Sequence, residues 1–90
     1  MLLKSYFELG EYNALDSLLD SFSRYIHRQK EMGYHRENYL NLIRFVKKII
    51  HTRVEDKKMW QQMKKEIEST SRLAEREWLL EKLKTTNHQV

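Results

Sequence analysis

The amino-acid sequence predicts an all-α fold, and three of its features lead to that prediction. Proline is absent from the 90 residues and glycine occurs only at Gly10 and Gly33, whereas the turns of β-sandwiches and barrels depend on such residues. Apolar residues recur at steps of three and four along most of the chain, which is the period of an amphipathic helix. Hydrophobic residues make up 40% of the chain, enough for one modest core at this length. We therefore expect a single helical domain.

The first two helices are expected at residues 2–9 and 13–32. Gly10 lies between them, where a left-handed C-terminal cap is common, and Asn13 is placed to accept a hydrogen bond from a backbone N–H of the second helix. Gly33 follows the second helix and is expected to end it. The apolar stripe of this helix is regular over about five turns and consists of Leu15, Leu18, Leu19, Phe22, Tyr25, Ile26 and Met32.

The third helix is expected at residues 36–53 and has the widest apolar face. At about 100° per residue, its apolar positions cover an arc of about 160°, which is more than a helix on the surface needs. We therefore expect this helix to lie between others. Its apolar residues are Tyr39, Leu42, Ile43, Phe45, Val46, Ile49 and Ile50.

The fourth helix is expected to begin near Glu55, with Asp56 as its N-terminal cap. Its apolar stripe is followed by Glu68-Ser69-Thr70-Ser71, and hydroxyl side chains compete for backbone hydrogen bonds. We therefore predict a break there and a fifth helix at residues 72–84. The alternative is one continuous helix from 55 to 84, in which Trp60 and Trp78 would share a face because they are about five turns apart. The stripe before the break is Met59, Trp60, Met63 and Ile67.

Residues 2–15, which read LLKSYFELGEYNAL, resemble the middle of a tetratricopeptide repeat, a helical hairpin that commonly reads LAxxYxxLGxYxxAL. The resemblance implies that Gly10 forms the tight turn, that Tyr12 closes over it, and that Ala14 or Leu15 is the close-contact position of the second helix. It covers about residues 2–22. Ala14 lies one residue closer to Gly10 than in the family pattern, and the pattern does not recur downstream at the family period of about 34 residues.

This resemblance implies a scaffold for protein–protein interaction, such as the terminal piece of a helical-repeat protein, and it implies no catalytic or ligand-binding residues. We expect residues 1–84 to form one tetratricopeptide-like helical bundle. Its four or five helices would pack as antiparallel hairpins, and residues 85–90 would form a frayed tail.

Several kinds of chemistry are excluded by composition and spacing. Cysteine is absent, so there is no disulfide, thiolate metal site or cysteine nucleophile. His27 and Glu31, like His51 and Glu55, have the i,i+4 spacing of two ligands on one helix face. Zinc takes three or four ligands, so we expect no metal and no cofactor. The G-x-S-x-G, P-loop and G-x-G-x-x-G motifs are absent, so we expect neither enzymatic activity nor a small-molecule substrate.

The sequence also predicts a cytoplasmic protein. No apolar run approaches the roughly 18 residues that span a bilayer. No segment has the charged and apolar regions of a signal peptide. We therefore expect no membrane partner.

Positive charge is concentrated in residues 24–65. The chain carries a net charge of +4, but this segment alone holds twelve Lys/Arg against four Asp/Glu. Cations near the C-terminal end of a helix complement its dipole, which explains part of the bias but not Lys57 and Lys58, since these sit near a helix start. A basic face can neutralise phosphates, so nucleic-acid binding is the alternative function. The candidate basic face is Arg24, Arg28, Arg44, Lys47, Lys48, His51, Lys57 and Lys58.

The favoured function is a non-catalytic helical interaction or scaffold module. The short first helix is expected to leave Leu3, Phe7 and Leu15 partly uncovered in a single copy, and exposed apolar patches of several hundred Å2 tend to mark interfaces. Tyr34, beside Gly33, is the aromatic residue expected to be exposed in a turn. These residues form the candidate interface. The expected partner is another protein or a second copy, in a homodimer that uses the same surface twice.

Overall fold

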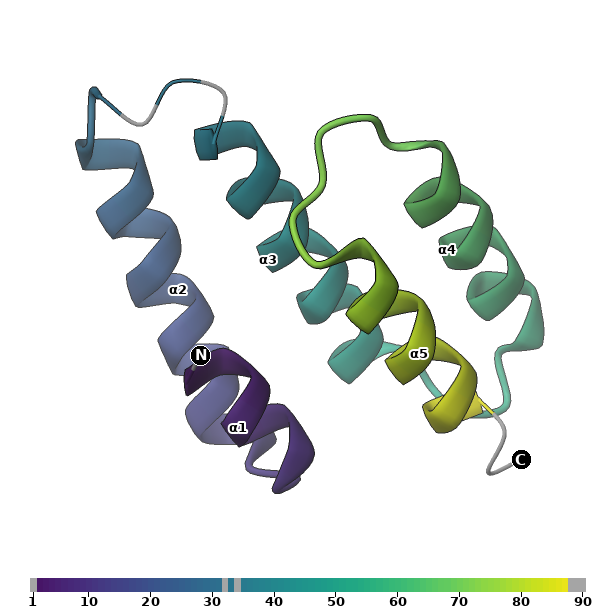
Figure 1. Ribbon diagram of the computed structural model, residues 1–90. Coiled ribbons are helices and arrows are strands. Elements are labelled where there is room, and N and C mark those ends of the chain that lie inside the picture. The colour runs from purple at the N-terminus through teal and green to yellow at the C-terminus, as the bar shows by residue number, and fades with distance from the viewer. Residues whose placement is uncertain (1, 32, 34, 88–90) are drawn as a thin grey trace.

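A computed structural model describes residues 2–31, 33 and 35–87, and these residues form five helices and no strand (Figure 1). The prediction of an all-α fold is therefore confirmed, with five helices rather than four. The helices are α1 (Leu2–Glu8), α2 (Tyr12–Arg28), α3 (His35–His51), α4 (Lys57–Ser69) and α5 (Arg76–Asn87).

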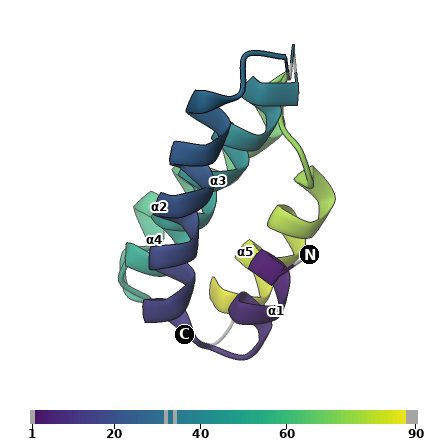
Figure 2. The same ribbon diagram turned by 90° about the vertical axis from the view of Figure 1, so that its left-hand side faces the viewer.

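The helices form two layers and run alternately up and down. In one layer, α2, α3 and α4 lie side by side, and α1 and α5 lie across one face of that layer (Figures 1 and 2). The contacts that join them are those of α1 with α2, α2 with α3, α3 with α5 and α4 with α5. The principal extents of 41 × 28 × 17 Å describe a flattened domain.

The core lies between the two layers, and α3 contributes most to it. Its wide apolar arc is confirmed, because Leu42, Ile43, Phe45, Val46 and Ile49 are all buried. Each of the other helices contributes a narrower stripe. The buried residues outside α3 are Leu3, Phe7, Leu15, Leu19, Ile26, Trp60, Met63, Ile67, Leu79 and Leu83.

Both predicted ends of α2 differ from those in the structure. The helix begins at Tyr12 with Glu11 as its N-cap, and the Glu11 side chain makes no capping hydrogen bond, so the prediction of Asn13 as the cap is wrong. The helix ends at Arg28, earlier than expected, because Gln29 adopts an extended conformation and its N–H bonds the carbonyl of Ile26. Met32, expected at the end of this helix, lies outside the described residues.

The predicted break between α4 and α5 is confirmed, and the continuous helix is not formed. The Ser69 and Thr70 hydroxyls both donate to the carbonyl of Glu66, at 3.2 and 2.6 Å, which is the competition for backbone acceptors that the sequence predicted. At the other end of α4, the Asp56 carboxylate accepts a hydrogen bond from the Met59 N–H at 3.2 Å. The prediction of this cap is also confirmed.

The linker from residue 70 to 75 is held against α3, which is why α5 starts at Arg76 instead of residue 72. Asn41 donates through Nδ2 to the Arg72 carbonyl at 2.7 Å, and the Ala74 N–H donates to the Asn38 carbonyl at 3.2 Å. In a helix that began at residue 72, the Arg72 carbonyl would instead accept a hydrogen bond from within the helix. The helix then includes residues 85–87, which were expected to fray, whereas residues 88–90 lie outside the described residues.

The hairpin of α1 and α2 turns at Gly10, which has a φ of +73° and so adopts the left-handed conformation predicted for it. The Phe7 ring contacts Tyr12 across the turn, at 5.8 Å between centroids, and Trp78 of α5, at 5.3 Å. Ion pairs from Lys4 to Glu75 and from Lys82 to Glu8 also join α1 to the α5 region.

These contacts correct the expected exposure of the first hairpin. Leu3, Phe7 and Leu15 are only 2%, 6% and 0% exposed, so the prediction that a single copy leaves them partly uncovered is wrong. The pattern of the first two helices carries no information about α5, which packs beside α1 and completes its cover. Tyr34, the fourth residue of the candidate interface, lies outside the described residues.

The central position of α3 predicts a large stability cost for Phe45→Ala. Phe45 is fully buried, and truncation of a buried phenylalanine to alanine commonly lowers the free energy of unfolding by about 3–5 kcal/mol. Urea unfolding followed by circular dichroism measures this change. Tyr25→Ala is the matched control, because Tyr25 is 55% exposed and surface substitutions usually change stability by about 0.5 kcal/mol or less. Equal effects of the two substitutions would contradict the assigned core.

Candidate functional site

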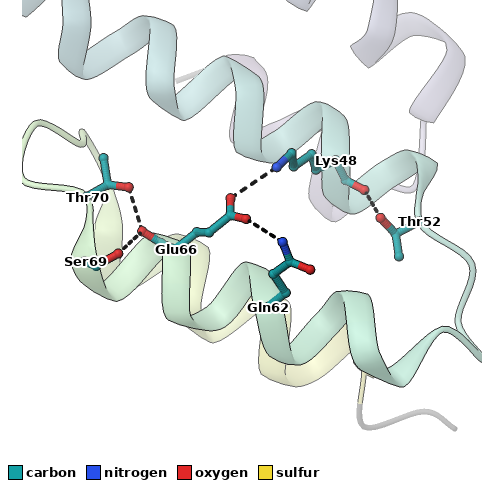
Figure 3. Close-up of polar contacts among 6 residues, drawn as sticks. All are labelled: Lys48, Thr52, Gln62, Glu66, Ser69 and Thr70. Carbon is teal, nitrogen blue, oxygen red and sulfur yellow. Dashed lines mark hydrogen bonds and ion pairs between the residues drawn. The ribbon is translucent and has the colours of Figure 1, made fainter.

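Three basic residues near the end of α3 lie beside carboxylates of the neighbouring helices. Lys47 forms an ion pair with Asp20 of α2, and the His51 Nε2 lies 3.2 Å from a carboxylate oxygen of Asp16. Lys48 forms an ion pair with Glu66 of α4 at 3.1 Å (Figure 3). These side chains therefore join helices within the domain and already have carboxylate partners.

Glu66 is the centre of a polar network between α3 and α4, seen in Figure 3. One carboxylate oxygen accepts from the Lys48 ammonium, and the other accepts from Gln62 Nε2 at 3.3 Å. On the α3 side, the Thr52 hydroxyl donates to the Lys48 carbonyl at 2.5 Å. The network fixes the spacing of the two helices at the surface of the three-helix layer.

The ionisable groups of these ion pairs have shifted pKa values. A hydrogen bond from Lys48 holds the pKa of Glu66 below its ordinary value, and partial desolvation opposes the shift. Hydrogen bonds from Lys47 and Lys82 lower the pKa of Asp20 and of Glu8 in the same way. The bond to Glu8 in turn raises the pKa of Lys82. All of these shifts favour the charged forms, as is expected of ion pairs between helices.

The remaining members of the candidate basic face are not brought together. Arg24 and Arg28 lie in the C-terminal part of α2, whereas Lys57 and Lys58 lie in the first turn of α4, at the opposite end of the layer (Figure 1). Arg44 is exposed on α3, with its guanidinium 4.6 Å from the centroid of the Phe45 ring. The eight predicted residues therefore form separate groups and not one continuous face.

A groove lies between α4 and α5. Its volume is about 510 Å3, within the range of about 300–1,000 Å3 that is common for binding sites. Trp60 and Leu83 form a buried floor, and Leu80 is the half-buried side chain that is most open to an incoming group. The lining residues are Trp60, Gln61, Lys64, Glu68, Leu80, Leu83 and Lys84.

The lysines near this groove differ from the other lysines of the chain. Lys4, Lys47, Lys48 and Lys82 are all in ion pairs. Within the described part of the chain, six lysines make no ion pair. One is Lys30, near the end of α2. The other five lie on α4 or line the groove, and all of them are exposed: Lys57, Lys58, Lys64, Lys65 and Lys84.

Sequence reasoning did not identify this groove. It placed Trp60 in the apolar stripe of the fourth helix, because periodicity shows which face of a helix is apolar but not where two such faces leave a gap. One signal was available. Lys57 and Lys58 lie at the helix end where the dipole disfavours cations, so intrinsic helix stability does not explain them.

Comparison of the chain with known protein families, with curated proteins and with solved structures found no match. The resemblance of residues 2–22 to a tetratricopeptide repeat therefore stays a prediction. Every helix in the described ranges is too short or too polar to cross a bilayer. Those ranges also contain no group of three or more His, Asp or Glu side chains placed to hold a metal ion.

The Glu66 ion pair predicts a specific loss of stability in acid. Because the pKa of Glu66 is lower in the folded chain than its ordinary value of 4.5, its contribution is present above that pH and is lost as the pH falls through the folded pKa. Glu66→Gln should therefore be less stable than wild type near neutral pH, and the difference should shrink as the pH falls toward about 3.

Urea unfolding at several pH values measures this difference. Glu68→Gln is the matched control, since Glu68 is exposed and makes no ion pair with the described residues. It should differ little from wild type at any pH. A stability difference for Glu66→Gln that does not change with pH would contradict the assigned role of the Lys48–Glu66 pair.

Proposed function

We propose that the chain is a non-catalytic helical module that binds another protein in the groove between α4 and α5. The groove is the observation that carries this proposal. It joins a buried apolar floor to exposed polar walls, which is the combination found in sites that accept an amphipathic segment of a partner. The half-buried Leu80 offers apolar contact, and the aliphatic stems of Lys64 and Lys84 extend it at the walls.

The α1–α2 hairpin supports the same class of function. Gly10 makes the turn, Tyr12 packs on Phe7 across it, and Leu15 is fully buried while Ala14 is exposed. In the tetratricopeptide resemblance these are the turn, the closing aromatic residue and the close-contact position. Proteins of that family are interaction scaffolds, and the proposed module would be a relative that keeps one such hairpin.

The charged groups support a role without catalysis. The carboxylates with lowered pKa values, Glu8, Asp20 and Glu66, are each bound to a lysine of another helix. General acid–base work needs a group whose pKa lies near the working pH, and these shifts move the carboxyl groups away from it. Their contacts serve to align helices.

A homodimer is the less favoured form of this module. The apolar residues predicted for its seam, Leu3, Phe7 and Leu15, are in the core. Self-association through the first hairpin would have to use the apolar side chains that stay exposed there, which are Leu2, Leu9 and Tyr12. Light scattering distinguishes the two forms. A mass near 11.1 kDa at all concentrations supports an external partner, and twice that mass supports the homodimer.

Selection from an unbiased library of 15-residue peptides tests the proposal. Peptides enriched on the wild-type chain should lose binding to Leu80→Gln, because this substitution places an amide at the apolar entrance of the groove. They should keep binding to Leu2→Gln, a matched control in which the leucine is 55% exposed on α1.

Circular dichroism confirms that both variants are folded before the comparison. Failure to enrich any peptide would overturn the proposal. So would enriched peptides whose binding is unaffected by Leu80→Gln.

Nucleic-acid binding is the second candidate function. The unpaired lysines of α4 favour it, because such cations can release the counterions of a phosphate backbone. The candidate residues then change from Lys47 and Lys48, which are bound to carboxylates, to Lys64 and Lys65. An oligonucleotide column tests this function. It is supported if the column retains the chain at about 50 mM salt and releases it by about 200 mM, and if charge reversal at Lys64 and Lys65 abolishes the retention.

A further inference from the structure

The two walls of the α4–α5 groove each carry a lysine. Lys64 lies on the α4 wall and Lys84 on the α5 wall, with the apolar floor between them. Glu68 is the one carboxylate among the lining residues. An occupant of the groove would therefore meet ammonium groups on both sides and a carboxylate at one point of the α4 wall.

The positive charge continues along the exposed side of α4. Lys57 and Lys64 are seven residues apart, as are Lys58 and Lys65, so each pair spans about two turns, or roughly 10.5 Å, on nearly the same face. The helix thus presents two adjacent lysine rows parallel to its axis. Both rows lie on the solvent side of α4, since all four residues are exposed.

Two of these lysines lie where the helix dipole disfavours a cation. Lys57 and Lys58 occupy the first turn of α4, which contains no acidic residue, and cations there oppose the helix dipole. The Asp56 cap lies next to them, but its carboxylate accepts a hydrogen bond from Met59 N–H and forms no ion pair with either lysine. Contacts with the described residues therefore do not account for Lys57 and Lys58, whereas an acidic ligand would give them partners.

We infer that the groove binds an acidic amphipathic helix of a partner protein. This inference rests on the proposed function and specifies the chemistry of the partner. The apolar side of such a helix would contact Leu80 and the lysine stems, and its carboxylates would meet Lys64 and Lys84 on the two walls. Carboxylates two turns apart in the partner would match the spacing of Lys57 and Lys64, because two helices that run side by side have the same rise per residue.

The groove favours this occupant over a nucleic acid. A phosphate backbone has no apolar side chain to place against Leu80, and it would meet Glu68 in the α4 wall. An acidic helix can turn its apolar or neutral side chains toward Glu68 and its carboxylates toward the lysines. Charge complementarity and the apolar floor thus select the same partner.

Two synthetic 14-residue helical peptides test the inference. The first carries leucines on one face and glutamates, two turns apart, beside them. The second has glutamine in place of every glutamate. The first peptide should bind more tightly to the wild-type chain in fluorescence anisotropy, and its affinity should fall as salt is raised, since exposed charge pairs are screened.

The double variant Lys64→Gln, Lys84→Gln should weaken binding of the first peptide about fivefold, as is typical of the loss of two exposed ion pairs. Arg28→Gln, Lys30→Gln is the matched control. It removes the same charge from exposed residues near the end of α2 that make no ion pair with the described residues. This control should leave the affinity nearly unchanged. All four substituted residues are exposed, so both double variants should stay folded.

Three outcomes would overturn the inference. Equal weakening by the two double variants would mean that the peptide senses only the net charge. Equal binding of the two peptides, with Leu80→Gln abolishing both, would leave the groove as a protein-binding site but show that its partner is not acidic. Tighter binding of an oligonucleotide than of the first peptide, unaffected by Leu80→Gln, would assign the lysines to nucleic acid. Absence of any peptide in the library selection would remove the proposed function as well.

Discussion

The burial of α3 constrains where every charged side chain of that helix can lie. Its apolar arc faces α2 on one side and α5 on the other, and Phe45 and Val46 are fully buried between them. The polar residues are confined to the rest of the helix surface, where Asn41 bonds the linker before α5. There Lys47 and Lys48 lie beside the carboxylates of α2 and α4, so the central position of α3 also produces the ion pairs that join the layer. By contrast, α4 lies at the edge of the layer (Figure 1), and its wider solvent face leaves room for lysines without partners.

This difference explains why charge counted along the sequence is a poor guide to charge on the surface. Residues 24–65 are strongly basic and residues 1–23 are acidic, which suggests separate regions. Asp16 and Asp20 nevertheless lie next to His51 and Lys47, because α2 and α3 are antiparallel neighbours. A cation in the sequence is available to a ligand only if no neighbouring helix carries a carboxylate at the same level. Lys47 is in an ion pair with Asp20, whereas Lys64 makes no ion pair with the described residues.

Local pattern was sufficient to predict the helices, because apolar spacing, the Gly10 turn, the Asp56 cap and the hydroxyl side chains near Thr70 are all encoded within a few residues. Features that depend on distant contacts were not predicted. The burial of Phe7 depends on Trp78, more than seventy residues later, and no periodicity in either helix contains that information. The late start of α5 likewise depends on hydrogen bonds from the linker to α3. For the candidate site, the sequence marked Lys57 as unexplained but did not indicate the groove beside it.

The groove itself depends on the break after α4. In a continuous helix from 55 to 84, Leu80 and Lys84 would lie beyond Trp60 along a single axis, and no second wall would exist. The hydroxyls of Ser69 and Thr70 end α4 at the Glu66 carbonyl, and the linker then returns the chain so that α5 runs back beside α4 (Figure 1). Glu66 thus has two roles, since its carbonyl helps to end the helix while its carboxylate joins α4 to α3. The position of both groove walls relative to α3 therefore follows from Glu66, Ser69 and Thr70, none of which lines the groove.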